Sequence, residues 1–438
     1  MTGRKLLMTF PVTPTSHLLS DVRVRGGYQT LQRVLTSMTP EQVTKEVTAA
    51  GILGHGGAAF PVGRKWAVIQ LSDGQPHYLC CNADEGEPGT FKDRWILENS
   101  PHQLIESMLI AAYALQVRNA FVYIRGEFDL PYRRLAGAVE EAYAVGLLGD
   151  KIMGSDFDCD LVIYRGAGSY VCGEASALIT SIEGKKGYPR NRPPRLTVRG
   201  LYQRPTVINN VESLSNIEVI VRMGAEEFRK IGTAKSPGTQ LVSISGHVEK
   251  PGVYEVEYGT PLRKFIYEDC GGVLGGKSLK CIIPGGISTK VLTDADIATV
   301  TYDHKAMEVV GSQVGSGGMV VIAEGTCMVR LLQVLLRFYH HESCGQCTPC
   351  REGMGWMHRI IDRIVDGKGR PEDIDALVHI SKANDGTTIC GMGDAAGFAT
   401  VGIIAKYRDE FEYYINNGRS KCGGVLEVDA PQREPAHA

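Results

Sequence analysis

Short apolar runs alternate with amphipathic stretches in the first half of the chain. Three runs are short enough to be buried strands, at 77–81, 120–124 and 160–164. Residues 102–115 and 132–145 instead carry apolar side chains three and four positions apart, which is typical of a helix packed on one face. Strands that alternate with helices in this way predict an α/β fold with a mainly parallel sheet.

The pattern changes near residue 240. From 239 to 322 the chain shows strand-like alternation, a Pro-Gly turn and one short helical segment, which predict a small α+β module. Beyond Cys327, helical spacing recurs in four segments: 328–339, 352–365, 373–383 and 395–407. A C-terminal helical bundle is the simplest packing for these segments. We therefore expect three domains, 1–238 with a helical N-terminal lead, 239–322 and 323–438.

Charge and composition exclude several classes of protein. The 47 Lys and Arg residues are balanced by 49 Asp and Glu residues, so no strong field exists to hold nucleic acid. No run of about eighteen apolar residues occurs and no signal peptide is recognisable, so we expect a cytoplasmic protein without a membrane span. Glycine accounts for 52 of 438 residues, about 12% against a usual 7%, which implies many close approaches to the backbone.

Cysteines crowd into one segment near the C-terminus. Cys344, Cys347 and Cys350 form two successive C-x2-C steps, and Cys390 follows after a helical stretch. Three closely spaced thiolates with one remote partner are typical of a [4Fe-4S] cluster, and Pro349 would let the backbone curl around it. Four cysteines also satisfy a structural zinc ion, but zinc sites usually pair two separated C-x2-C steps. We predict the iron-sulfur cluster and keep zinc as the alternative.

A glycine-rich segment precedes the first predicted strand. Gly54, Gly56 and Gly57 would let backbone N–H groups approach a phosphate or a flat ring, and Lys65 would supply charge. The segment lacks the Gly-Lys-Ser/Thr ending of a Walker A motif. A glycine-rich turn without any ligand would explain the same residues.

Polar side chains follow the first predicted strand. Asn82, Asp84, Glu85 and Glu87 lie directly after it, where ligands of open α/β sheets bind. Carboxylates repel phosphate but accept hydrogen bonds from ribose hydroxyls and ring N–H groups. The alternative is a solvated turn.

Two further segments have the composition of a cofactor site. The first, 165–175, contains Tyr170, Gly173 and Glu174 before a predicted helix, whose N-terminus suits an anion. It lacks the third glycine of the dinucleotide fingerprint, so an ordinary Rossmann dehydrogenase is disfavoured. The second places the amides Asn209 and Asn210 side by side, which suits a heterocycle edge or a phosphate but also a plain turn.

Together, these segments and the cysteine set resemble the flavoprotein subunit that oxidises NADH in respiratory complex I. They also resemble its relatives in NAD(P)-linked hydrogenases and formate dehydrogenases. The most specific segments are NADEGEPGTFKDR, RGAGSYVCGE, PTVINNVE and ESCGQCTPCREG. The resemblance implies a Rossmann-like FMN domain, a ubiquitin-like β-grasp domain and a helical bundle that carries [4Fe-4S]. It covers nearly the whole chain.

The resemblance also implies roles for individual residues. FMN contacts would fall on Gly54, Gly56, Gly57, Lys65, Asn82, Asp84, Glu85, Tyr170, Gly173, Glu174, Asn209 and Asn210. The flavin itself would perform hydride transfer, so no catalytic acid or base is expected, and Glu85 and Glu87 would orient the reactants. The implied partners are a thioredoxin-like [2Fe-2S] subunit and a multi-cluster iron-sulfur subunit of a larger complex, on the inner face of the membrane.

The implied nicotinamide pocket departs from the family pattern. Phe60 stands where the family places one aromatic against the adenine, but Val68 and Arg195 occupy the places of two others. Losing base stacking worth about 1 to 3 kcal/mol would raise a dissociation constant roughly tenfold to a hundredfold.

Charged positions of this pocket differ as well. Ala175 replaces the second acid of the family's Gly-Glu-Glu, and His55 replaces an arginine, whereas Glu87 is retained and Arg192 stands in place of a lysine. Three interpretations remain open. The chain uses NADH, it favours a more anionic nucleotide such as NADPH, or its flavin exchanges electrons with another donor and the chain is an electron relay.

Overall fold

The computed structural model describes residues 3–69, 74 and 76–422. A four-stranded sheet with the order β3-β2-β1-β4 forms the centre of the first part of the chain. All three neighbouring pairs are parallel, as the alternation of strands and helices predicted. The strands are β1 (Tyr78–Ala83), β2 (Asn119–Ile124), β3 (Asp160–Arg165) and β4 (Thr206–Asn210). Because the strands run in one direction, their carboxyl ends share one edge of the sheet.

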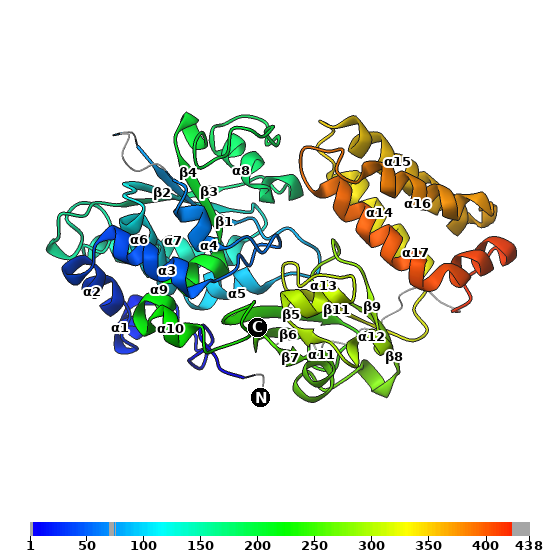
Figure 1. The fold of residues 1–438 in the computed structure, drawn as a ribbon, viewed down its shortest axis with the longest axis horizontal. Coiled ribbons are helices and arrows are strands. Elements are labelled where there is room, and N and C mark those ends of the chain that lie inside the picture. The colour runs from blue at the N-terminus through cyan, green and yellow to red at the C-terminus, as the bar shows by residue number, and fades with distance from the viewer. Residues whose placement is uncertain (1–2, 70–73, 75, 423–438) are drawn as a thin grey trace, which may run out of the picture.

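Helices pack around this sheet (Figure 1). The central one, α6 (Pro101–Ala114), is buried on nearly all sides because it contacts β1 and the outer helices α2, α3, α7 and α9. The other main helices of this part are α1 (Leu19–Val24), α2 (Gln29–Ser37), α3 (Pro40–Ala50), α4 (Val62–Trp66), α5 (Lys92–Asn99), α7 (Asp129–Ala144), α8 (Ala175–Ile182), α9 (Val211–Met223) and α10 (Ala225–Phe228). Helix α3 begins with a capping box, in which Thr39 and Gln42 cap each other's backbone N–H groups.

A second sheet follows, with the order β6-β5-β11-β8-β9. Its central pair, β5 and β11, is parallel, and the outer pairs are antiparallel. The strands are β5 (Thr239–Gly246), β6 (Gly252–Glu257), β8 (Leu279–Ile283), β9 (Leu292–Thr293) and β11 (Gly318–Ala323). A two-stranded ribbon of β7 (Thr260–Pro261) and β10 (Thr301–Tyr302) accompanies it, with the short helices α11 (Leu262–Lys264), α12 (Asp294–Ile297) and α13 (His304–Val309).

Four helices close the described chain: α14 (Met328–Glu342), α15 (Thr348–Arg363), α16 (Glu372–Asn384) and α17 (Met392–Asn417). They pack against one another as a bundle, at the right of Figure 1. Helix α15 begins earlier than the apolar pattern suggested, because Pro349 occupies its first turn, where a missing N–H is harmless. The expectation that Pro349 lets the backbone curl around the cluster is therefore wrong, because Pro349 lies in the first turn of a helix. Residues 423–438 of the predicted third domain lie outside the described residues.

The N-terminal segment is hydrogen-bonded to the second sheet. Glu255, on β6, is buried and accepts hydrogen bonds from the backbone N–H groups of Leu6, Leu7 and Met8 at 2.6 to 3.1 Å. Such a carboxylate satisfies donors that would otherwise be buried without a partner. Within the described part of the chain, no helix has both the length and the apolar character that crossing a membrane requires.

Candidate functional site

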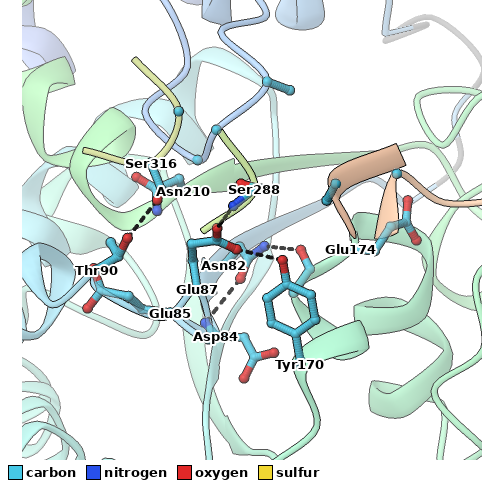
Figure 2. A pocket seen from close by; sticks show the side chains of 18 of the residues that line it. Asn82, Asp84, Glu85, Glu87, Thr90, Tyr170, Glu174, Asn210, Ser288 and Ser316 are labelled. Carbon is cyan, nitrogen blue, oxygen red and sulfur yellow. Dashed lines mark hydrogen bonds between the residues drawn. The ribbon is translucent and has the colours of Figure 1, made fainter. Parts of the chain in front are cut away.

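A cavity of about 440 Å³ lies beside the carboxyl ends of β1 and β4. Segments from all three parts of the chain line it. The glycine-rich segment and the residues after β1 contribute one wall, loops of the second sheet contribute Ser288 and Ser316, and the start of α17 contributes Cys390 and Phe398. Figure 2 shows the polar side chains that converge on it. The location matches the sheet edge that the polar residues after the first strand predicted.

The glycine-rich segment forms a closed loop at the cavity. The N–H of Gly54 donates to the carbonyl of Phe60 at 3.1 Å, and Gly56 and Gly57 line the cavity. Gly57 has a φ of +105°, and a Cβ added to it would meet no atom within 4 Å. At Gly56 the added Cβ would lie 3.2 Å from the Cβ of Asn210. The loop therefore leaves room above Gly57 for the close approach of a ligand.

Asn82 and Asp84 hold the strand end in place. The Asn82 amide donates to the carbonyl of Gly173 at 2.8 Å and accepts the N–H of Asp84 at 3.0 Å. Oxygen Oδ2 of Asp84 is buried and has no hydrogen-bond partner among the described residues. Burial raises the pKa of Asp84 to about 7, because a carboxylate loses hydration there. A buried acceptor without a partner at the cavity wall suits a ligand N–H or hydroxyl.

Glu85 is committed to the start of helix α5. Its carboxylate accepts the backbone N–H groups of Lys92 at 2.9 Å, Asp93 at 2.8 Å and Arg94 at 3.1 Å. Burial, with the nearby Asp93 adding to it, raises the pKa of Glu85. The side chain lines the cavity and fixes α5 against the strand.

Glu87 joins two parts of the cavity wall. Tyr170 donates its phenol O–H to Glu87 at 2.5 Å, and the N–H of Ser288 donates to the other carboxylate oxygen at 2.8 Å (Figure 2). Burial raises the pKa of Glu87, while the hydrogen bonds from Tyr170 and Ser288 oppose the shift. The backbone N–H of Tyr170 in turn donates to Glu342, at the end of α14, at 3.1 Å. Tyr170 therefore connects the cavity to the helix that leads into the cysteine segment.

A buried ion cluster forms part of the cavity wall. The Lys92 ammonium lies 2.8 Å from Asp93 and 2.7 Å from Glu212, and the side chains of all three are almost wholly buried. Asn210 donates its amide to Asp93. Sequence reasoning missed Lys92, Asp93 and Glu212. Helix α5 is itself rich in polar residues, so no local signal marks Lys92 and Asp93 as buried.

Three helices have their N-termini at the cavity. Glu174 caps α8 by accepting the N–H groups of Ser176 at 2.8 Å and Ala177 at 3.0 Å. Asn210 caps α9 by accepting the N–H of Glu212 at 3.0 Å, and Glu85 holds the start of α5 as described above. The positive ends of helix dipoles favour an anionic group nearby.

Other predicted contact residues lie behind the cavity wall. The Lys65 ammonium donates to the carbonyl of Ile208 at 2.5 Å, and burial, with Arg192 nearby, lowers its pKa to about 8. Asn209 accepts the indole N–H of Trp66 at 3.1 Å. Neither Lys65 nor Asn209 is among the residues that line the cavity, and the same holds for Gly54.

The residues predicted to hold a nucleotide are mostly exposed. Phe60 is 51% exposed and Val68 is 47% exposed. Arg195 lies on the exposed segment after α8, where Arg192 forms an ion pair with Glu174 at 3.0 Å. Glu87 alone of this predicted set lines the cavity.

The four clustered cysteines come together at the start of α15 and α17. Cys350 is buried, the other three are half-buried, and Cys390 lines the cavity. Cys347 accepts the backbone N–H of Ile389 at 3.4 Å. Burial raises the pKa of Cys390 to about 11, and Cys350 and Cys344 add to the shift because they lie nearby. All twelve cysteines are free thiols.

The spacing of these thiols bears on the kind of metal site. Among the described residues, no three His, Cys, Asp or Glu side chains are placed to hold a single metal ion. A zinc site needs its four ligands around one ion, whereas each cysteine of a cubane binds a different iron. Three close cysteines and one remote cysteine in the sequence fit the cluster better than zinc.

Comparison with known proteins matches three family models to this chain. Residues 47–219 match the Nuo51 FMN-binding domain, residues 240–322 an SLBB domain, and residues 330–414 the NADH-ubiquinone oxidoreductase-F iron-sulfur binding region. The parallel sheet lies within the first stretch, and the second sheet and the helical bundle coincide with the other two apart from a few terminal residues.

Whole-length relatives are similar as well. An F subunit of NADH-quinone oxidoreductase from Rhizobium meliloti (strain 1021) is 45% identical over 406 residues, which cover 93% of this chain and 96% of that protein. The F subunit of NADH-quinone oxidoreductase from Mycobacterium bovis is 46% identical over 396 residues, 90% of this chain and 88% of that protein. A solved NAD⁺-reducing [NiFe]-hydrogenase in the H2-reduced state superposes with a TM-score of 0.81 at 34% identity, over 89% of this chain and 64% of that one.

Proposed function

Because this chain belongs to the family of NADH-quinone oxidoreductase F subunits, we propose that it is an electron-transfer flavoprotein that takes electrons from NADH. It would bind FMN and one [4Fe-4S] cluster. The observation that carries the proposal is the shared cavity. The strand ends of the parallel sheet and Cys390 of the cysteine set line the same space, so the two redox groups would be neighbours.

The residues of the cavity fit a flavin mononucleotide. FMN supplies the hydride acceptor and the conversion of electron pairs to single electrons. The N-terminus of α9, which the uncharged Asn210 caps, favours its phosphate, and Asp84 offers an acceptor without a partner. We assign its binding to Gly56, Gly57, Asn82, Asp84, Glu85, Tyr170, Gly173, Glu174 and Asn210, with Gly54, Lys65 and Asn209 supporting the wall.

Positioning is the task of the remaining polar groups. Glu87 is fixed by Tyr170 and Ser288, so its carboxylate is held at one place on the cavity wall. Glu85 fixes α5 through three backbone N–H groups. Neither carboxylate needs to move a proton, since hydride transfer requires no general base. Phe60, Arg192 and Arg195 would contact the nucleotide outside the cavity.

The cysteine set would hold the cluster. Cys344, Cys347, Cys350 and Cys390 supply one thiolate for each of its four irons. Residues 1–238, 239–322 and 323–438 would form the FMN domain, a ubiquitin-like β-grasp domain and the cluster-bearing bundle. The parallel pairing of β5 with β11 at the centre of the second sheet supports the β-grasp assignment.

Electrons need an acceptor beyond the cluster. The relatives are subunits by name, so this chain would work within a larger redox complex. Its partners would be a thioredoxin-like [2Fe-2S] subunit and a multi-cluster iron-sulfur subunit, on the cytoplasmic face of the membrane.

Metal and flavin analysis of protein purified without air tests the proposal. We expect one FMN and four irons per chain, and bleaching of the flavin absorbance when NADH is added. Zinc without iron would restore the structural-zinc alternative, and a colourless protein with neither group would refute the proposal.

The electron relay remains the second candidate. Phe60 is the sole aromatic at the three places where we expected base stacking, and Val68 and Arg195 are exposed there. A flavin that dithionite reduces but neither NADH nor NADPH reduces would favour the relay.

A further inference from the structure

A second hollow adjoins helix α8, apart from the flavin cavity. Its volume is about 540 Å³, and the segment from Glu183 to Gln203 forms most of its wall. The charged residues that line it are five cations and one carboxylate: Lys185, Lys186, Arg190, Arg192, Arg199 and Glu183. The lining thus carries an excess of positive charge, although the whole chain has a net charge of −2.

Some of these cations are already engaged by the protein. Glu183 forms ion pairs with Lys185 at 3.2 Å and Arg190 at 2.9 Å. Arg190 also donates to the Thr180 hydroxyl at 2.9 Å and the Gly200 carbonyl at 3.2 Å, so its guanidinium holds the segment against α8. Among the described residues that line the hollow, the one carboxylate is therefore already paired with cations of the protein.

Lys186 and Arg199, by contrast, are not engaged by a carboxylate in the described part of the chain. Both are exposed, and neither forms an ion pair with a carboxylate of the described residues. The Lys186 ammonium lies 5.8 Å from the centre of the Tyr188 ring. The hydroxyls of Ser176 and Thr180, both buried, also line the hollow. Their hydroxyl protons are donated within the chain, to Glu174 and to the Ser176 carbonyl, so Lys186 and Arg199 supply the charge and the N–H donors that a phosphate dianion requires.

One carboxylate links this hollow to the flavin cavity. Glu174 lines the flavin cavity and forms an ion pair with Arg192, which lines the hollow. Ser176 donates its hydroxyl to Glu174 and accepts the backbone N–H of Arg190 at 2.8 Å. A nucleotide with its nicotinamide at the flavin therefore has a phosphate-binding surface beside it.

We propose that this hollow binds the additional phosphate of NADPH, so that the chain accepts NADPH as well as NADH. The inference rests on the proposed function, because it places the nicotinamide at the flavin. NADH has a hydroxyl where NADPH carries this phosphate, so Lys186 and Arg199 act on NADPH alone. The pyrophosphate, which NADH and NADPH share, is the other anionic group that these two cations could bind.

Anaerobic titration of the flavin absorbance with each nucleotide tests the proposal. We compare the purified wild-type protein with the double variant K186A/R199A and with K45A/K235A, which removes two exposed lysines that line neither hollow. The dissociation constant for NADPH is expected to rise about tenfold to a hundredfold in K186A/R199A, as two charge-assisted contacts are lost. That for NADH is expected to change less than about threefold, and the control to match the wild type.

Direct binding separates this inference from the proposed function. Calorimetry with adenosine 2′-phosphate and adenosine 5′-phosphate needs no flavin chemistry, and we expect K186A/R199A to weaken only the 2′-phosphate. If the double variant weakens the binding of both adenosine phosphates equally, or of NADH and NADPH equally, the hollow binds a phosphate that both ligands share. Either result overturns the proposal. Unchanged binding of both compounds in the double variant also overturns the proposal. A bound flavin that no nucleotide bleaches overturns the proposed function, even where the calorimetric result stands.

Discussion

The wall of the flavin cavity and the segment that carries the cysteines are held by different kinds of contact. Around the cavity, Glu85, Glu174 and Asn210 each accept backbone N–H groups at the start of a helix. Between Ser343 and Cys350 the contacts are longer and involve thiols, such as Ser343 with Cys350 at 3.2 Å. The cavity is organised by the chain's own hydrogen bonds, whereas the cysteine segment has few such bonds among the described residues, and the proposed cluster would join its parts.

Removal of a cysteine should have the largest effect. Cys350→Ser would take away one of the four proposed thiolate ligands, so we expect near-complete loss of iron, measured by metal analysis after anaerobic purification. Bound FMN should remain at close to one per chain, because hydrogen bonds hold its cavity. Cys159→Ala, which removes a buried thiol beside β3, should keep the iron. Loss of flavin together with iron in Cys350→Ser would contradict the distinction between the two regions.

Breaking the buried ion cluster should have the next largest effect. Lys92→Met leaves Glu212 and Asp93 buried without their cation, which should lower the free energy of unfolding by about 3 to 5 kcal/mol. Chemical denaturation measures the change. Arg263→Met, which breaks an exposed pair with Asp294, serves as the control and should cost about 1 kcal/mol or less. Similar losses in both variants would argue against a preorganised cavity wall.

Asp84 should make stability depend on pH. Burial raises its pKa to about 7, above the value near 4 of an exposed aspartate, so the folded chain keeps a proton that the unfolded chain releases. Below about pH 4 this residue makes its full contribution to the free energy of unfolding. As the pH rises to about 7 that contribution is lost, and the free energy of unfolding falls by roughly 2 to 4 kcal/mol.

The variant Asp84→Asn cannot titrate, so this part of the decline should disappear. Unfolding of flavin-free protein at several values between pH 4 and pH 7 measures it, with Asp150→Asn at an exposed position as the control. An unchanged slope in Asp84→Asn would mean that another buried acid is responsible.

The smallest effect is expected at a helix cap. Glu174→Ala leaves the first N–H groups of α8 without their acceptor, which should cost about 1 kcal/mol. Glu174→Gln keeps an acceptor oxygen and should recover much of the loss. Thermal unfolding and flavin retention report the two consequences. If Glu174→Gln is no better than Glu174→Ala, the ion pair with Arg192 matters more than the cap.

The sequence predicted those helices and strands that periodicity within a single segment reveals. The alternation of apolar runs predicted β1, β2 and β3 of the parallel sheet, but not β4 (Thr206–Asn210), whose asparagines were interpreted as a ligand site or a turn. The polar residues after β1 indicated the sheet edge where the cavity lies. The start of α15 was placed too late, since Thr348 and Pro349 are part of its first turn but carry no apolar periodicity.

Long-range contacts were beyond such reasoning. Nothing in the sequence near Lys92 indicates that Glu212, far along the chain, supplies its counter-ion. The same holds for Ser288, whose N–H fixes Glu87 from another sheet, and for Glu255, which binds the N-terminal segment. These pairs form only when separate units pack together, so periodicity within one segment cannot reveal them.

The cavity wall contains residues from His55 to Phe398. A chain that is still being synthesised must therefore have emerged as far as the start of α17 before the last wall of the cavity can close. Flavin insertion would then be a late event in biogenesis, after translation of the bundle. A truncated product that ends before Met392 would fold its parallel sheet but leave the cofactor space open to solvent on one side.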